Sequence, residues 1–171
     1  MKSIGYDQVP QIVYGFGTTI AYKSFSLGAF FQGVAKCDLS TLVGEFVPYV
    51  NGAAKGNVYA DITKRWTPEN QGVGAIYPRL NYGGVKNQNY ASSTFWLQDG
   101  SFIRLKTLDF GYTLPSKLTK KVGIDNFRVY FMGNNLLTFT KFDRYDVELG
   151  SGSGTKYPNV RTYSVGFNFN F

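Results

Sequence analysis

The sequence has no histidine, one cysteine and no long apolar run, and each absence excludes a class of function. Without histidine the chain cannot form a His-based catalytic triad or the commonest zinc and haem sites. Cys37 has no second cysteine with which to form a disulfide or a cysteine metal site. No run of about 18 apolar residues is present, so no membrane-spanning helix is predicted. We therefore expect neither an enzyme nor a bound cofactor or metal.

Two further features are scarce. Residues 1–6 lack the apolar stretch of about 7–15 residues that signal peptides contain, so an exported protein is expected to be either the mature chain or a fragment whose export signal lies elsewhere. The net charge of +7 is spread along the chain, and its tightest cluster is Lys117, Lys120 and Lys121. Nucleic-acid binding requires a larger basic face with interleaved aromatic residues, so no nucleic-acid partner is expected.

Aromatic residues are abundant, at 18%, and there are 20 glycines, a composition typical of β-rich chains with many turns. Residues 161–171 show the clearest pattern, because apolar and polar residues alternate there without a break. The apolar set is Tyr163, Val165, Phe167, Phe169 and Phe171. Period-two alternation over about 9–11 residues is the pattern of a transmembrane β-barrel strand with one lipid-facing and one water-facing side.

Four more long strands are expected, at residues 11–22, 25–37, 101–114 and 126–139. Lys23 and Ser24 form a tight turn between the first two. In the third, Arg104 and Lys106 share the parity that is apolar later in the strand, so this half is expected beyond the membrane or past a bulge. A change of parity is expected near residues 133–135. Asp109 and Arg128 are expected to face the interior and to pair.

The connections between these strands alternate as short, long, short and long. In an antiparallel meander this places both long loops at one end, as in outer-membrane barrels. The first long loop, residues 38–91, is predicted to hold a short helix at 62–66 capped by Asp61. A short strand is predicted at 93–97, followed by a hairpin turn at Asp99 and Gly100.

Five long strands cannot close a barrel, because the smallest transmembrane barrels have about eight. Either strands remain unrecognised in the long loop, or the chain is the last part of a larger barrel, and the sequence favours the second. In the second loop, Asp143, Asp146 and Glu148 could bind Ca²⁺, but their spacing matches no defined calcium loop. A solvated external loop is the favoured interpretation of these carboxylates.

The chain resembles the carboxy-terminal part of SusC/RagA-like TonB-linked outer-membrane proteins of Bacteroidetes. The most specific matches are DGSFIRLK at 99–106, GYTLP at 111–115, NLLTFTKF at 135–142 and YPNVRTYS at 157–164. RWTPEN at 65–70 is similar to an external-loop motif of the family. YDVE at 145–148 departs from the usual Tyr-Asp-Pro-Glu at Val147.

The resemblance implies an all-β fold in which residues 1–171 form the last five strands of an antiparallel transmembrane barrel of about 22 strands, with long external loops. It implies import of glycans or peptides across the cell outer membrane. Implied partners are outer-membrane lipid, the rest of the barrel with its plug, a SusD-like lipoprotein, and TonB through a segment outside this chain.

Two sets of candidate functional residues follow. The alternation Tyr163, Val165, Phe167, Phe169 and Phe171 resembles the carboxy-terminal signal read by the barrel-assembly machinery. Loop aromatic residues could contact a ligand or a lid protein, although local packing explains them at least as well: Trp66, Tyr77, Tyr82, Tyr90 and Trp96. The alternatives to the importer are a soluble β-sandwich module for carbohydrate binding or adhesion, and a small closed barrel of about eight strands.

Overall fold

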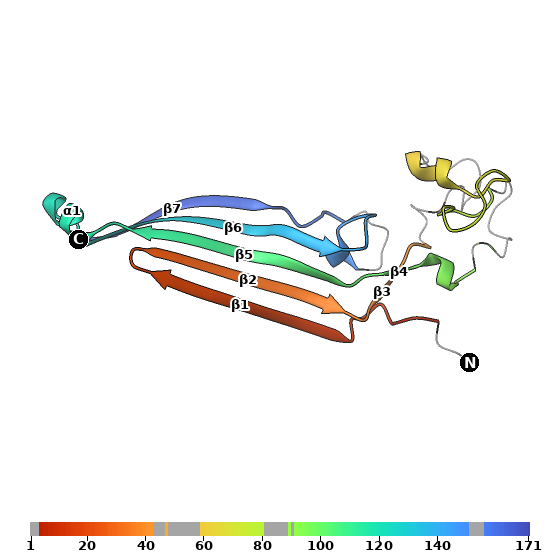
Figure 1. Cartoon of the computed structure of the whole chain (residues 1–171), viewed down its shortest axis with the longest axis horizontal. Coiled ribbons are helices and arrows are strands. Elements are labelled where there is room, and N and C mark those ends of the chain that lie inside the picture. The colour runs from red at the N-terminus through yellow and green to blue at the C-terminus, as the bar shows by residue number, and fades with distance from the viewer. Residues whose placement is uncertain (1–3, 43–46, 48–58, 81–88, 90, 151–155) are drawn as a thin grey trace.

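The computed structural model describes residues 4–42, 47, 59–80, 89, 91–150 and 156–171, and its main feature is one antiparallel sheet of five long strands. The long strands are β1 (Ile12–Tyr22), β2 (Phe25–Ala35), β5 (Phe102–Thr113), β6 (Asn126–Thr140) and β7 (Thr162–Asn170). Each pairs with the next long strand of the chain, in the order β1-β2-β5-β6-β7 (Figure 1). The five predicted strands and their meander are confirmed.

Short elements occupy the connections. They are β3 (Asp38–Ser40), η1 (Ala60–Lys64), η3 (Thr94–Trp96), β4 (Leu97–Asp99), α1 (Ser116–Thr119), η4 (Lys120–Val122) and η5 (Val147–Leu149). Among the described residues, no helix is long and apolar enough to span a membrane. The strands and their loops therefore define the architecture.

The strand register places like residues in rows across the whole sheet. One row joins Tyr22, Phe25, Tyr112, Val129 and Phe167, and every partner in it is apolar or aromatic. Successive side chains of a strand point to opposite faces, so rows of this kind lie on one side, here called the apolar face. Its side chains are exposed in this chain, including Phe16, Ile20, Phe110, Val165 and Phe167.

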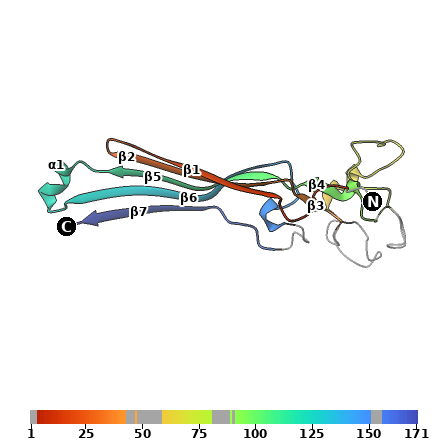
Figure 2. The same cartoon turned by 90° about the horizontal axis from the view of Figure 1, so that it is seen from below.

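The neighbouring row joins Ala21, Ser26, Gly111, Tyr130 and Gly166 on the opposite side, here called the polar face. Seen from below, the sheet forms a single layer, and no described element lies over it (Figure 2). A β-sandwich buries its apolar rows against a second sheet about 10 Å away. The described residues contain no such second layer, so the sandwich alternative is not supported.

Two bulges adjust the register near the middle of the sheet. Phe30 pairs with Thr107 and Phe31 with Leu105, so Lys106 is an extra residue of β5. On the other side, β6 carries the extra residues next to Asn135, whose φ is 53°. The parity of β5 therefore changes at Lys106, which moves Arg104 to the polar face. The bulge, one of the two alternatives expected for this half of the strand, and the change of parity near residue 135 are both confirmed.

The short connections lie at one end of the sheet and the long connections at the other. The Lys23–Ser24 turn, with Lys23 at φ 54°, lies at the same end as α1 and the end of β7 (Figure 1). The segments that contain η1, β3, β4 and η5 lie at the other end. This confirms the predicted arrangement of tight turns at one end and long loops at the other.

Three local predictions were wrong. Residues 94–96 form η3 rather than a strand, and Asp99 and Gly100 do not close a hairpin, because β4 pairs with β3 in a separate two-stranded sheet. Asp99 instead accepts a hydrogen bond from the Ser101 amide. The first loop helix begins at Ala60, and Asp61 lies within it and makes no cap. Its carboxylate accepts hydrogen bonds from the Tyr77 hydroxyl and from Arg144 Nη1.

The two faces are distinguished by adjacent phenylalanines at the centre of β2. Phe31 stacks on Phe16 on the apolar face, with ring centroids 5.2 Å apart, whereas Phe30 lies on the polar face. In lipid, we expect Phe31→Arg to lower the free energy of unfolding by about 2–4 kcal/mol, the cost of arginine on a barrel surface at the bilayer midplane. Phe30→Arg is the matched control and is expected to cost less than about 1 kcal/mol, because its side faces water. Guanidinium titrations in vesicles measure both, and equal losses would contradict the assignment of faces.

Candidate functional site

An ion pair crosses the polar face at its tight-turn end. Arg128 Nη2 lies 2.7 Å from Asp109 Oδ1 and donates a second hydrogen bond to Ser26 Oγ at 3.1 Å. Gly111 of β5 pairs with Ser26 of β2, and a Cβ at this position would collide with the Arg128 guanidinium. Because Gly111 has no side chain, Arg128 has room to extend across β5 to β2. The predicted pairing of Asp109 with Arg128 is confirmed.

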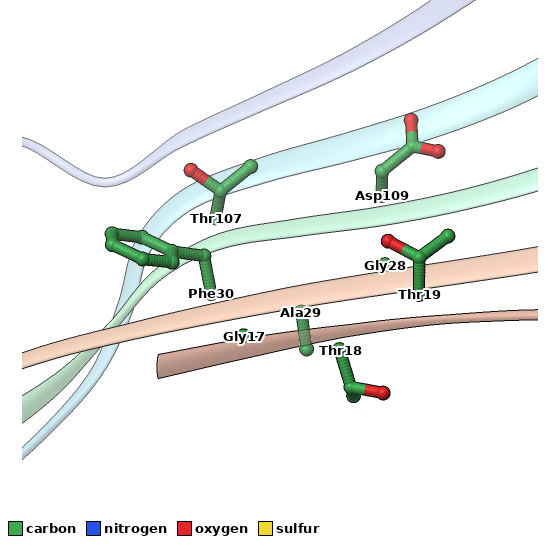
Figure 3. Close-up of a pocket in the computed structure, with 8 residues that line it drawn as sticks. All are labelled: Gly17, Thr18, Thr19, Gly28, Ala29, Phe30, Thr107 and Asp109. Carbon is green, nitrogen blue, oxygen red and sulfur yellow. The ribbon is translucent and has the colours of Figure 1, made fainter. Parts of the chain in front are cut away.

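A shallow hollow of about 300 Å³ adjoins this pair on the polar face (Figure 3). Thr19, Phe30, Thr107 and Asp109 project to the same side there, whereas Thr18 projects to the opposite side. The Phe30 ring lies over two glycines of β1, since a Cβ at Gly17 would be 3.1 Å from Phe30 Cδ2. The hydroxyls and the carboxylate make this a surface that water can wet.

The second charge cluster fixes the loop after β6 to the sheet. On the polar face, Arg104 forms ion pairs with Asp146 and, at 2.9 Å, with Glu148. Lys106 Nζ lies 2.7 Å from Glu148. The Arg104 side chain is only 5% exposed, so this pairing occurs largely out of water. Asp146 also accepts hydrogen bonds from the Glu148 and Asn159 amides, which closes the turn at η5.

This cluster, named here the loop anchor and made of Arg104, Lys106, Asp146 and Glu148, corrects the sequence interpretation. Asp146 and Glu148 are ion-paired and largely buried rather than solvated. Among the described residues, no group of three or more Asp, Glu, His or Cys side chains could hold a metal. Sequence reasoning missed the pairing, although a signal was present: an Arg-x-Lys spacing on a strand and an Asp-x-Glu spacing in a loop.

The Asp146 carboxylate is held in its ionised form. Burial raises its pKa, but hydrogen bonds from Arg104 and from the Glu148 and Asn159 amides, with the nearby Arg104 charge, outweigh burial and lower the pKa below the ordinary 3.8. A carboxylate that stays charged at neutral pH keeps Arg104 compensated. The cost of a buried, unpaired arginine is thereby avoided.

Apolar packing reinforces the anchor. A buried cluster joins β3, β5 and the second loop, and its members are Leu39, Phe102, Phe142 and Val147, with Val34 and Tyr145 packed against it. Phe142 and Tyr145 meet edge to face, with centroids 4.6 Å apart. The Tyr145 hydroxyl donates to the Gly150 carbonyl at 2.9 Å. Val147, which departs from the family motif, fills this core at 4% exposure.

Arg144 connects the two long loops to each other. Its Nη1 pairs with Asp61 and donates to the Tyr77 hydroxyl at 3.0 Å, and its guanidinium carbon lies 5.4 Å from the Tyr77 ring centroid. Burial and the neighbouring Asp61 carboxylate together raise the pKa of Tyr77 further than Arg144 lowers it, so the phenol stays protonated at neutral pH. The loops that follow β2 and β6 are thus joined through one arginine.

An open cleft of about 610 Å³ lies beside Arg144. Its lining residues carry both signs of charge, and they are Tyr59, Asp61, Lys64, Ile76, Gln98, Asp99, Lys141, Asp143 and Arg144. The cleft belongs to the loop end of the molecule. Its described lining residues offer hydrogen-bonding groups but no nucleophile paired with a base.

The predicted loop aromatic residues fall into three groups. Tyr77 and Trp96 are buried with Val47 in a loop core, which is the local-packing alternative. Trp66 is half-buried, and its amide donates to the Tyr77 carbonyl at 2.8 Å. Tyr82 and Tyr90 lie outside the described residues. A ligand or lid contact through this set stays a prediction.

The terminal set Tyr163, Val165, Phe167, Phe169 and Phe171 is exposed on the apolar face or, for Phe171, just beyond it. Phe127 lies beside two of these rings, with centroids 6.1 Å from Phe167 and 6.5 Å from Phe169. The structure thus places the set on the surface that the sequence pattern indicated. Its role as an assembly signal stays a prediction.

A single-layer meander with an exposed apolar face, a polar face and unequal ends defines a segment of transmembrane β-barrel wall. No family model matches the chain. Comparison with individual known proteins agrees with the assignment to a barrel wall. TonB-dependent receptor P3 of Formosa agariphila is 33% identical over 99% of this chain and 17% of its own length, and TonB-dependent receptor P26 of the same organism is 30% identical over 95% and 17%.

Solved structures show the same relationship. The RagAB peptide transporter matches with a TM-score of 0.74 and 30% identity, covering 97% of this chain and 18% of the matched chain. The RagAB peptide importer in its open-open state matches with a TM-score of 0.70 and 29% identity, covering 95% and 17%. The chain belongs to the SusC/RagA-like TonB-dependent receptors and spans about one sixth of the length of these relatives.

The loop anchor predicts a pH dependence of stability. Because folding lowers the pKa of Asp146, its contribution is fully present above the unfolded pKa near 3.8 and is lost as the pH falls through the lower folded value. Asp146→Asn is therefore expected to cost about 1–3 kcal/mol at pH 6 and to flatten the fall in stability below pH 4. Urea titrations in detergent from pH 6 to pH 3 measure this.

The matched control is Asp143→Asn, because Asp143 forms no ion pair with the other described residues. It is expected to keep both the neutral-pH stability and the acid dependence of the native chain. If Asp146→Asn behaves like Asp143→Asn, the loop is not held by this anchor.

Proposed function

We propose that this chain forms part of the barrel wall and outer loops of an outer-membrane, TonB-dependent importer of glycans or peptides. The observation that carries this proposal is the continuous apolar face across all five long strands, opposite a polar face with threonines and a spanning ion pair. Water-soluble sheets bury such a face, whereas barrels present it to hydrocarbon. The relatives named as TonB-dependent receptors support the transport role.

The proposed placement puts the tight turns in the periplasm and the long loops outside. Residues 1–171 then form the carboxy-terminal portion of the barrel, and the plug and the TonB-contacting segment belong to the rest of the receptor. A SusD-like lipoprotein covers the outer loops in this proposal. Support comes from the RagAB peptide importer structures, whose matched chains are about six times as long as the aligned segment.

We assign three roles to side chains within this proposal. The terminal set Tyr163, Val165, Phe167, Phe169 and Phe171 is the signal for barrel assembly, and its exposure on the end strand supports this role. Trp66, with Tyr82 and Tyr90, remains a proposed contact for ligand or lid. The Arg144 cluster holds the two loops in a fixed relation at the mouth.

Adjacent residues of β6 provide the direct test of membrane placement. Phe131 lies on the apolar face opposite Phe110, and Met132 lies on the polar face opposite Asp109. Cys37, the one thiol of residues 1–171, is 3% exposed and adds little to the labelling background. In the membrane-inserted receptor, Met132→Cys is expected to react with a charged, water-soluble maleimide, whereas Phe131→Cys is protected by lipid.

Detergent solubilisation followed by unfolding serves as the control, after which both thiols are expected to react equally. Equal labelling in the membrane would show that the apolar face is not in contact with lipid. A monodisperse, soluble chain without detergent would lead to the same conclusion.

Transport is tested separately in cells that express the intact receptor. We expect uptake of labelled oligopeptides or oligosaccharides that stops when the receptor gene is disrupted and also when TonB is removed. Uptake through the receptor that continues without TonB would contradict the importer mechanism, while membrane insertion would remain supported by the labelling pattern.

A further inference from the structure

The tight-turn end of the sheet is strongly basic. Residues 20–27, 111–128 and 166–171 lie at this end and contain four lysines, Arg128 and one acidic side chain, Asp125, besides the carboxylate at Phe171. Arg128 is already paired with Asp109 on the polar face. The lysines are Lys23, Lys117, Lys120 and Lys121, and none forms an ion pair with another described residue. Four positive charges are therefore available to an outside partner.

Exposed apolar side chains accompany these lysines in the short helical segments α1 and η4. Leu118 is 57% exposed and Val122 is 70% exposed, and they alternate with Lys117, Lys120 and Lys121 along the chain. Lysines with exposed aliphatic neighbours suit the boundary between lipid chains and headgroups, because the ammonium groups contact headgroups and water while the aliphatic side chains contact lipid chains. A wholly aqueous turn gains nothing from the exposed leucine and valine.

Aromatic rings of the apolar face form a row next to the lysines. Phe25 and Tyr112 have centroids 4.7 Å apart, and Lys23 Nζ lies 5.3 Å from the Tyr22 ring centroid. Phe169 and Phe171 lie beyond the Val129–Phe167 pairing at the same end of the sheet, with centroids 5.4 Å apart. In transmembrane barrels, aromatic girdles mark the level of the lipid headgroups. The lysines thus lie at or just beyond that level.

We propose that Lys23, Lys117, Lys120 and Lys121 form a docking surface for anionic phospholipid headgroups of the inner leaflet of the outer membrane. This inference rests on the proposed function, because only the membrane placement puts the tight turns at that leaflet. Charge complementarity selects the occupant: four uncompensated cations attract a lipid with net negative charge and discriminate against a zwitterionic one. The aliphatic side chains between them insert beside the lipid chains.

The test compares lipid retention by the intact receptor purified from nanodiscs of two compositions. One contains phosphatidylethanolamine alone, and the other contains a minor fraction of phosphatidylglycerol. The native receptor is expected to co-purify with phosphatidylglycerol enriched over its bulk fraction, as counted by native mass spectrometry. The triple variant Lys117→Gln, Lys120→Gln, Lys121→Gln is expected to lose this enrichment, by about fivefold for each lysine at low salt.

The matched control is Lys64→Gln, Lys141→Gln, Lys156→Gln, which removes three lysines from the loop end of the same chain. It is expected to retain the native enrichment. Unchanged enrichment in the first triple variant, or equal loss in both variants, would overturn the docking surface. In either case, lipid protection of Phe131→Cys would show that the membrane placement itself still holds. Both variants are judged only on receptor that shows this protection, which separates misfolding from lost lipid binding.

Discussion

Every peptide group that crosses hydrocarbon must find its hydrogen bond inside the protein, and this constraint organises the chain. Each N–H or C=O left unpaired in lipid costs several kcal/mol, so the strands can enter a membrane only as a continuous hydrogen-bonded ladder. Within the described residues, β1 and β7 each have one free edge. Those edges have to be paired by the rest of a closed barrel.

Register then decides what each face can touch. Because side chains alternate, one added residue moves all later side chains to the opposite face. The Lys106 bulge in β5 and the bulge beside Asn135 in β6 occur together, so the rows stay matched across the sheet. Their consequence is that Arg104 lies on the polar face, where Asp146 and Glu148 can reach it. Without the bulges, its charge would face lipid.

The long loops are held by ion pairs as well as by packing. The loop anchor fixes η5 to the polar face, and Arg144 joins the same loop to Asp61 and Tyr77 of the preceding one. Loops of this length lose much conformational freedom on ordering, so each needs specific contacts. The chain thus provides a connected path from the polar face of the sheet to the mouth. In an importer, such a path places the mouth at a defined position relative to the lumen.

The sequence alone determined the long strands, their two faces, the order of short and long connections, and the pair Asp109–Arg128. The strands, faces and turns follow from local rules, since alternation and turn residues act over a few positions. Asp109 and Arg128 are 19 positions apart, but they lie on consecutive strands joined by a short connection, so the strand pattern already placed them side by side. The tertiary structure decided the loop interior. The pairing of β3 with β4, the burial of Tyr77 and Trp96, and the anchor at Arg104 join residues that are more than 15 positions apart. Such contacts depend on where folded strands bring the loops, which no local pattern encodes.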